Sequence, residues 1–218
     1  KLTITKRSIT VEVDAVSRTY GERNPNFTAN TVKSGSLVNG DTLVLTLTTT
    51  ATKTSPVGKY DVTLKLSDSP NYAVTVEGKD KLTVTPKSIT VTVNAASRAY
   101  GEANPAFTAT VPSGALVGDD TVESLNLTLS SDATTTSPAG TYNVTGTANN
   151  ANYIVTVEGS QKRTVTKKEL TVNDLAFADR PITREYDGKT DAAITVQIKD
   201  SAKVKADDVL PTVTGICT

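Results

Sequence analysis

Residues 8–29 read SITVEVDAVSRTYGERNPNFTA, and residues 88–109 repeat them as SITVTVNAASRAYGEANPAFTA. The two stretches lie 80 positions apart and share a Tyr-Gly-Glu-x-Asn-Pro box. Self-similarity at a fixed period is the signature of a repeat protein. The chain is therefore predicted to contain two copies of one module in tandem.

Three further landmarks recur in the same order, with an offset that drifts only between 78 and 82 residues. They are a Gly-Asp turn (40–41 and 118–119), a Ser-Pro-x-Gly-x-Tyr segment (55–60 and 137–142) and an Asn-Tyr pair (71–72 and 152–153). The organisation that follows is the end of a preceding repeat at 1–5, a first repeat at 6–85, a second repeat at 86–166 and a partial β module at 167–218.

Within each repeat, apolar and polar residues alternate. Ile9, Val11 and Val13 fall on one face of a segment whose other face is polar, and turn residues interrupt such segments about every ten positions. Period-two alternation indicates half-buried strands. This spacing favours an antiparallel β-sandwich over a sheet built from βαβ units. The fold class is therefore predicted to be all-β, with tandem antiparallel sandwich modules.

Two features refine this prediction. Gly-x-Tyr-x-Val at 58–62 and 140–144 resembles the tyrosine-corner strand of immunoglobulin-like folds. The alternative is a β-grasp-like module with a short helix after Gly118, where Asp119 or Asp120 would cap residues 121–125. All seven Tyr residues stand at recurring landmarks, so they are expected to anchor the core rather than bind a ligand.

The connection between the repeats is short and stiff. Residues 82–91 pass from the last strand of one repeat to the first strand of the next without a Gly/Ser spacer. Pro86 in the middle of this segment has a fixed φ and cannot donate a backbone hydrogen bond. The sequence therefore predicts modules joined end to end as an elongated rod.

Composition excludes several functions. The chain has no His and a single Cys, Cys217, so Ser-His and Cys-His nucleophiles, zinc-histidine sites and a disulfide framework are absent. Its 23 basic residues balance its 23 acidic ones, and neither a long basic run nor a membrane-length apolar run occurs. The chain is expected to be no enzyme, with no catalytic residue, cofactor or metal, no nucleic acid partner and no membrane insertion.

Asp119-Asp120 and Asp207-Asp208 could begin a calcium site, because hard cations bind clustered carboxylates. The spacing of these residues matches no EF-hand loop, and a Gly-Asp turn needs no ion. The interpretation as a turn is therefore preferred.

The four landmarks together resemble the tandem MBG domain of bacterial surface proteins, in its Tyr-Gly form, over about residues 6–166. The third segment carries Glu185-Tyr186-Asp187-Gly188-Lys189-Thr190 and later Asp207-Asp208-Val209, and it is similar to the first half of a YDG domain. The resemblance implies a large, repetitive, secreted adhesin or cell-wall protein at the bacterial surface. It transfers no catalytic residue.

Two functions from different classes remain. In the first, the repeats are a monomeric stalk that projects a terminal functional domain, and their partners are the neighbouring repeats of the same chain. In the second, the repeat loops bind a host glycan or protein, with contacts from six candidates: Tyr20, Arg23, Asn24, Tyr100, Asn104 and Asn150. Exposure of Tyr20 and Tyr100 distinguishes the two, because an adhesive surface would expose both rings.

Overall fold

The computed structural model describes residues 1–177, 185, 188, 191–205 and 212–216. The described residues form short strands and two single-turn 3-10 helices, which confirms the all-β prediction. The chain divides into two compact units, each treated by itself below. Unit 1 holds Lys1–Thr92, Ala109–Thr128 and Gly146–Glu158, and unit 2 holds Val93–Thr108, Leu129–Thr145 and Gly159–Thr218. Unit 1 thus contains the first repeat together with the part of the second repeat that contacts it.

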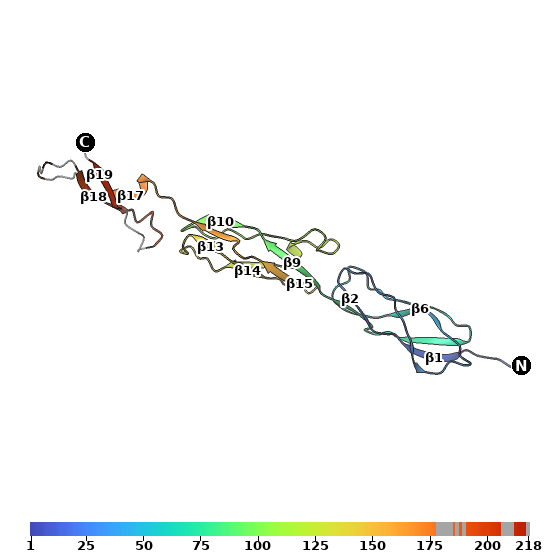
Figure 1. Cartoon of the computed structure of the whole chain (residues 1–218). Coiled ribbons are helices and arrows are strands. Elements are labelled where there is room, and N and C mark those ends of the chain that lie inside the picture. Colours follow the sequence, from blue (N-terminus) through green and yellow to red (C-terminus); the bar gives the residue numbers. More distant parts are fainter. Residues whose placement is uncertain (178–184, 186–187, 189–190, 206–211, 217–218) are drawn as a thin grey trace. The chain divides into compact units, whose positions relative to one another are not determined.

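The first repeat consists of three small sheets (Figure 1). One sheet places β1 between β3 and β7, another places β8 between β2 and β5, and the third pairs β4 with β6. The strands are β1 (Arg7–Glu12), β2 (Val16–Thr19), β3 (Thr31–Ser34), β4 (Val44–Thr48), β5 (Gly58–Tyr60), β6 (Thr63–Asp68), β7 (Tyr72–Glu77) and β8 (Leu82–Thr85).

The second repeat has the same topology. Strand β9 lies between β11 and β15, strand β16 lies between β10 and β13, and β12 pairs with β14. The strands are β9 (Lys87–Val93), β10 (Ala96–Ala99), β11 (Ala109–Thr110), β12 (Thr128–Ser131), β13 (Gly140–Tyr142), β14 (Val144–Thr147), β15 (Tyr153–Glu158) and β16 (Arg163–Thr166). The repeats seen in the sequence are therefore repeats of structure.

The expectation of purely antiparallel pairing was wrong, because each repeat has mixed sheets. Strand β1 runs parallel to β7, and β2 runs parallel to β8. The second repeat has the same two parallel pairs, β9 with β15 and β10 with β16. A parallel pair needs a long crossover, and here the intervening strands of the repeat supply it in place of a helix. Alternation within strands cannot reveal this, since it is the same for both kinds of pairing.

The third module begins with a 3-10 turn, η2 (Val172–Asp174), closed by a capping box between Thr171 and Asp174. Strand β18 (Asp191–Ile198) then pairs antiparallel with β17 (Leu175–Phe177) and with β19 (Thr212–Ile216) (Figure 1). Most of the predicted YDG motif, together with Asp207, Asp208 and Cys217, lies outside the described residues.

The predicted alternation is confirmed in the core. Ile9, Val11 and Val13 are each at most 1% exposed, while the side chains between them face outward or are only half-buried. One cluster of the first repeat gathers Ile9, Val11 and Tyr72, and another gathers Val13, Ala51, Val62 and Leu82. Burial of these apolar side chains offsets the conformational entropy that is lost when the short strands become ordered.

One core position differs sharply between the repeats. Leu82 opens β8 opposite Val16, and Arg163 opens β16 opposite Ala96 at the equivalent place. Both side chains are fully buried. Arg163 Nη2 donates to Asn104 Oδ1 at 3.0 Å, while its Nε and Nη1 have no hydrogen-bond partner among the described residues. Burial and then the nearby Arg98 lower the pKa of Arg163. The second repeat therefore contains an incompletely paired charge where the first contains a leucine.

The short helix expected after Gly118 is present as η1 (Glu123–Leu125), but its predicted cap was wrong. Val122 occupies the N-cap position, and no side chain caps the turn. Asp120 is unavailable for capping because its carboxylate accepts two phenol hydroxyls instead. A single 3-10 turn is also too short to be the helix of a β-grasp module, so the described residues do not support that alternative.

Candidate functional site at the repeat junction

The two repeats are joined with no flexible spacer. Strand β8 ends at Thr85, β9 begins at Lys87, and only Pro86 lies between them. The Tyr20 N–H donates to the Thr85 carbonyl at 2.8 Å, so the last residue of β8 is also held from the side. The connection is therefore short, has a fixed φ at its centre and is hydrogen-bonded at its start.

The Tyr-Gly box builds a rigid turn beside this connection. Arg18 is 5% exposed, and its guanidinium Nε donates to Asn24 Oδ1 at 2.7 Å. Asn24 Nδ2 in turn donates to the Ala51 carbonyl at 2.6 Å, and Glu22 Oε2 accepts from the Thr19 N–H at 2.8 Å. The spacing of Arg, Tyr-Gly, Glu and Asn that recurs in the two repeats is thus explained by one hydrogen-bonded loop, which fixes the position of Tyr20.

The Tyr20 ring is buried against the second repeat. It is 4% exposed and meets the Tyr153 ring edge to face, with 5.5 Å between centroids and an interplanar angle of 88°. The Tyr20 hydroxyl donates to Asp120 Oδ2 at 3.0 Å, and the Tyr153 hydroxyl donates to the same oxygen at 2.5 Å. Burial and then the Asp120 carboxylate raise the pKa of Tyr20 above its ordinary value. Two phenols and one carboxylate therefore connect the repeats.

Gly21 permits a close contact next to this triad. Its φ is +89°, and a Cβ at this position would lie 2.5 Å from Val117 Cγ2. Val117 is 6% exposed, and its N–H donates to the Tyr153 hydroxyl at 2.9 Å. The Val57 N–H donates to Asn152 Oδ1 at 2.9 Å, which is a further direct bond between the repeats. A residue larger than Gly would separate the two surfaces.

The junction has a continuous core of its own. A single buried cluster draws Tyr20 and Val84 from the first repeat and Ile89, Val91, Val117, Leu125 and Tyr153 from the second. Shared burial of this kind couples neighbouring repeats energetically, as in other tandem arrays.

The second Tyr-Gly turn is built in the same way inside unit 2. Arg98 Nε donates to Asn104 Oδ1 at 2.9 Å, and Glu102 Oε2 accepts from the Ala99 N–H at 2.9 Å. A Cβ on Gly101 would lie 2.5 Å from Val204 Cγ2, so a valine of the third module takes the place that Val117 has against Gly21. The turn thus contacts the following module in both cases.

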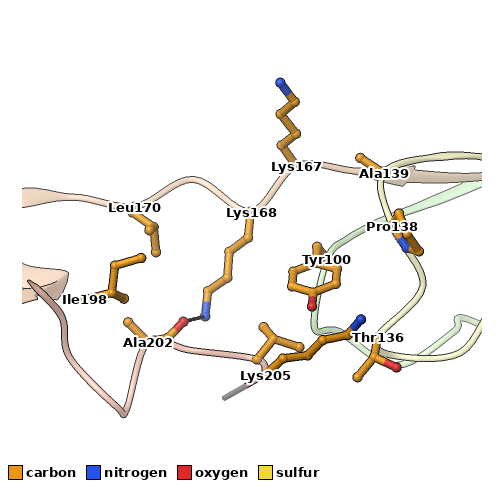
Figure 2. A pocket seen from close by; sticks show the side chains of 11 residues that line it. Tyr100, Thr136, Pro138, Ala139, Lys167, Lys168, Leu170, Ile198, Ala202 and Lys205 are labelled. Carbon is orange, nitrogen blue, oxygen red and sulfur yellow. Dashed lines mark hydrogen bonds between the residues drawn. The ribbon is translucent and has the colours of Figure 1, made fainter. Parts of the chain in front are cut away.

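Tyr100 differs from Tyr20 in its surroundings. Its ring is only half-buried and lines a cleft of about 620 Å³. Figure 2 shows the ring beside Thr136 and Pro138, with Lys167 directed away from it and Lys168 directed toward Ala202. Lys168 Nζ donates to the Ala202 carbonyl at 2.7 Å. The lining of the cleft is mainly apolar and includes three lysines, Lys167, Lys168 and Lys205.

The sequence model of the MBG domain (YGX type) matches residues 9–83 and again residues 89–161. The chain belongs to this family. The two matches fall within the repeats expected at 6–85 and 86–166, and together they cover more than half of the chain. Comparison with curated proteins gave no match, and neither did comparison with solved structures. Domains of the MBG family occur in repeat-containing surface proteins.

The six residues proposed as ligand contacts have different environments in the MBG repeats. Tyr20 is buried in the junction, Tyr100 is half-buried in the cleft, and Arg23 is exposed. Asn24 and Asn104 each support a Tyr-Gly turn through their side-chain amides, and Asn150 Nδ2 donates to the Ser124 carbonyl at 2.9 Å. The structure brings Tyr20 to Asp120 and Tyr153, not to another of the six. That any of them contacts a ligand stays a prediction.

Sequence reasoning missed three residues of the second repeat that form the MBG junction, namely Val117, Asp120 and Asn152. The signal was present, because the Gly-Asp turn and the Asn-Tyr pair recur in both repeats. It was misaligned by one position, however. Asp41 accepts from Tyr72, and Asp120 accepts from Tyr153, so Asp41 corresponds to Asp120 rather than to Asp119.

The described part of the chain shows neither a metal-binding cluster nor a membrane-spanning helix. No cluster of three or more His, Cys, Asp or Glu residues there is arranged to hold a metal ion. Likewise, none of the described helices is both long and apolar enough to cross a membrane.

Proposed function

We propose that these MBG repeats are stalk modules of a bacterial cell-surface adhesin or cell-wall protein. They would hold a terminal functional domain away from the surface, without enzymatic activity and without a cofactor. The third module would be a partial YDG-like domain, and the chain would be extracellular and monomeric. Membership of a family found in repeat-containing surface proteins supports the location.

The observation that carries the proposal is the buried junction of Tyr20, Asp120 and Tyr153. A flexible chain of beads needs linkers between folded modules, whereas here Pro86 alone separates β8 from β9. A shared core and direct hydrogen bonds resist bending and exclude proteases from the connection. Both properties are what a spacer requires.

The test is the rotational motion of the repeats. In ¹⁵N relaxation measurements, amides of the first and second repeats are expected to report one common correlation time. A control variant with a Gly-Ser-Gly-Ser insertion after Pro86 is expected to separate the two values. Small-angle scattering should give a radius of gyration well above the roughly 17 Å of a compact chain of this length. Independent tumbling of the natural chain, or a compact radius, would contradict the stalk.

One observation favours the alternative, an adhesive module that binds a host glycan or protein. The half-buried Tyr100 lines an apolar cleft of about 620 Å³, and aromatic side chains in such places commonly anchor ligands. Chemical-shift changes around Tyr100 on titration with host glycans or matrix proteins, lost in Tyr100→Ala, would favour adhesion. The absence of saturable changes would leave the stalk as the function.

A further inference from the structure

The first repeat carries its own copy of the surface that receives Tyr20 in the second repeat. The Val38 N–H donates to the Tyr72 hydroxyl at 2.9 Å, and this hydroxyl donates to Asp41 Oδ2 at 2.7 Å. The corresponding bonds of the second repeat run from Val117 to Tyr153 and from Tyr153 to Asp120. The acceptor geometry is therefore preformed in the first repeat.

The two surfaces differ in what covers them. Val117 is 6% exposed because Gly21 and Tyr20 lie on it, whereas the equivalent Val38 is 39% exposed. Asn152 is half-buried and accepts from the Val57 N–H, whereas the equivalent Asn71 is exposed. The first repeat thus presents in open form the groups that are occupied in the second.

A cleft with an unsatisfied polar group marks the same place. Its volume is about 350 Å³, and it is lined by Gly40, Asp41 and Thr42 on one side and by Ser69, Pro70, Asn71 and Tyr72 on the other. Ser69 is 7% exposed, and its Oγ has no hydrogen-bond partner in the part of the chain that the structure describes. A buried hydroxyl without a partner is costly, so the packing at this edge of the open cleft is incompletely satisfied.

We propose that this surface, formed by Val38, Asp41 and residues 69–72, binds the Tyr-Gly turn of another MBG repeat placed ahead of the first one. The incoming phenol would donate to Asp41 and meet the Tyr72 ring edge to face. The incoming glycine would lie on Val38, and a backbone N–H of its Ser-Pro-x-Gly segment would donate to Asn71. The occupant is inferred from the internal junction, where the same four groups hold Tyr20, Gly21 and Val57.

The inference deepens the proposed function, on which it rests, because it supplies the rule by which stalk repeats stack. Each Tyr-Gly turn would bind the Val-x-x-Asp turn of the following repeat. Gly101 against Val204 already follows this rule inside unit 2, and Asp207 follows Val204 at the same spacing in the sequence. Repeats that lack either turn would not be accepted as neighbours.

Thiol reactivity tests the rule. Two single-cysteine variants of the full chain are made in a Cys217→Ser background. Val38→Cys places the thiol on the open surface of the first repeat, and Val117→Cys places it on the covered surface of the second. The exposed Cys at 38 should react with a maleimide at least about tenfold faster than the buried one at 117, since a buried thiol reacts only through local opening. In an extended chain, a second copy of residues 7–86 that keeps its Val38 is inserted directly before Arg7, and the cysteine stays at position 38 of the original repeat. The reaction of this cysteine should slow to about the rate measured at 117.

A matched control uses the same extended chain with Tyr20→Ala in the added copy only, and it should restore the fast reaction at position 38. Circular dichroism checks that each variant is folded. Unchanged reactivity at 38 in the extended chain would overturn the docking rule and leave the natural junction intact. Equal rates at 38 and 117 in the unextended chain would instead overturn the buried junction, and with it the proposed function.

Discussion

Replacing Arg163 by leucine is expected to stabilise the second repeat. The change installs the residue that the first repeat has at the equivalent position, Leu82, in a site of the same topology. Arg163 is 0% exposed, and its Nε and Nη1 are without hydrogen-bond partners in the described residues. Leucine removes both donors and the buried charge while keeping an apolar side chain in the core.

The size of the effect follows from the bonds involved. Each unsatisfied buried donor costs about 1–3 kcal/mol, so removing two yields about 2–6 kcal/mol. The lost hydrogen bond from Arg163 to Asn104 offsets about 1.5–3 kcal/mol of this, and Asn104 Oδ1 still accepts from Arg98. The net gain is about 2 kcal/mol, which for a domain of this size raises Tm by roughly 8–16 °C.

The measurement is hydrogen exchange of the β10, β13 and β16 amides, combined with thermal unfolding. Exchange reports the second repeat separately, which is needed because a chain of several modules does not unfold in one step. The reciprocal variant Leu82→Arg should destabilise the first repeat by at least the same amount. Slower exchange in Arg163→Leu is expected; faster exchange, with a lower Tm, would refute the reasoning and show that the guanidinium is fully compensated in solution.

Three further predictions concern the junction and the surface. Tyr20→Phe keeps the ring but removes the hydrogen bond to Asp120, so it should lower the stability of the junction in urea unfolding by about 1 kcal/mol. The control Tyr100→Phe should change the stability little. Equal effects of the two variants would contradict the role of the Tyr20 hydroxyl. Gly21→Ala adds a Cβ 2.5 Å from Val117 Cγ2 at a φ of +89°. Its Tm should fall clearly below that of the control Gly114→Ala, where φ is +75° and the space around the new Cβ is open. Similar Tm values for the two variants would disprove the close contact. Hydrogen bonds from Lys33 and then Lys81 lower the pKa of Glu12 from 4.5 to about 2. The stabilisation from these two ion pairs is therefore present above pH 4.5 and is lost as the pH falls toward 2. Glu12→Gln should flatten the pH dependence of the urea unfolding midpoint over that range at low salt. An unchanged pH dependence would show that the ion pairs of Glu12 do not cause it.

Local patterns in the sequence predicted the elements well, because they depend on neighbouring residues. Alternation at Ile9, Val11 and Val13 identified a buried face, and the recurring Tyr-Gly box located the repeats. The alternation pattern did not predict which strands pair, since the side-chain period of a strand is the same in parallel and antiparallel sheets. The parallel pairs of β1 with β7 and of β2 with β8 therefore appeared only in the structure.

The site was harder to predict than the fold. Tyr20 and Asp120 are 100 residues apart, and neither residue alone signals a partner at that distance. The recurrence of Tyr was correctly attributed to packing at Tyr20, Tyr72 and Tyr153, which are buried, whereas Tyr100 is only half-buried. The ring of Tyr20 packs on the next repeat rather than on its own. Arg163 had a readable signal: it alternates with Val165 as Leu82 does with Val84, which places a charge on the buried face.

The parallel pairing of β1 with β7 has a mechanical consequence. The chain enters the first repeat at β1 and leaves it after β8, and β1 and β7 point the same way in full register from Arg7 with Tyr72 to Glu12 with Glu77. Tension applied to the two ends of the repeat pulls such strands past each other, so the rungs of the ladder must break together rather than one after another. A pulling force on the repeat would thus meet a long, cooperative resistance in this strand pair.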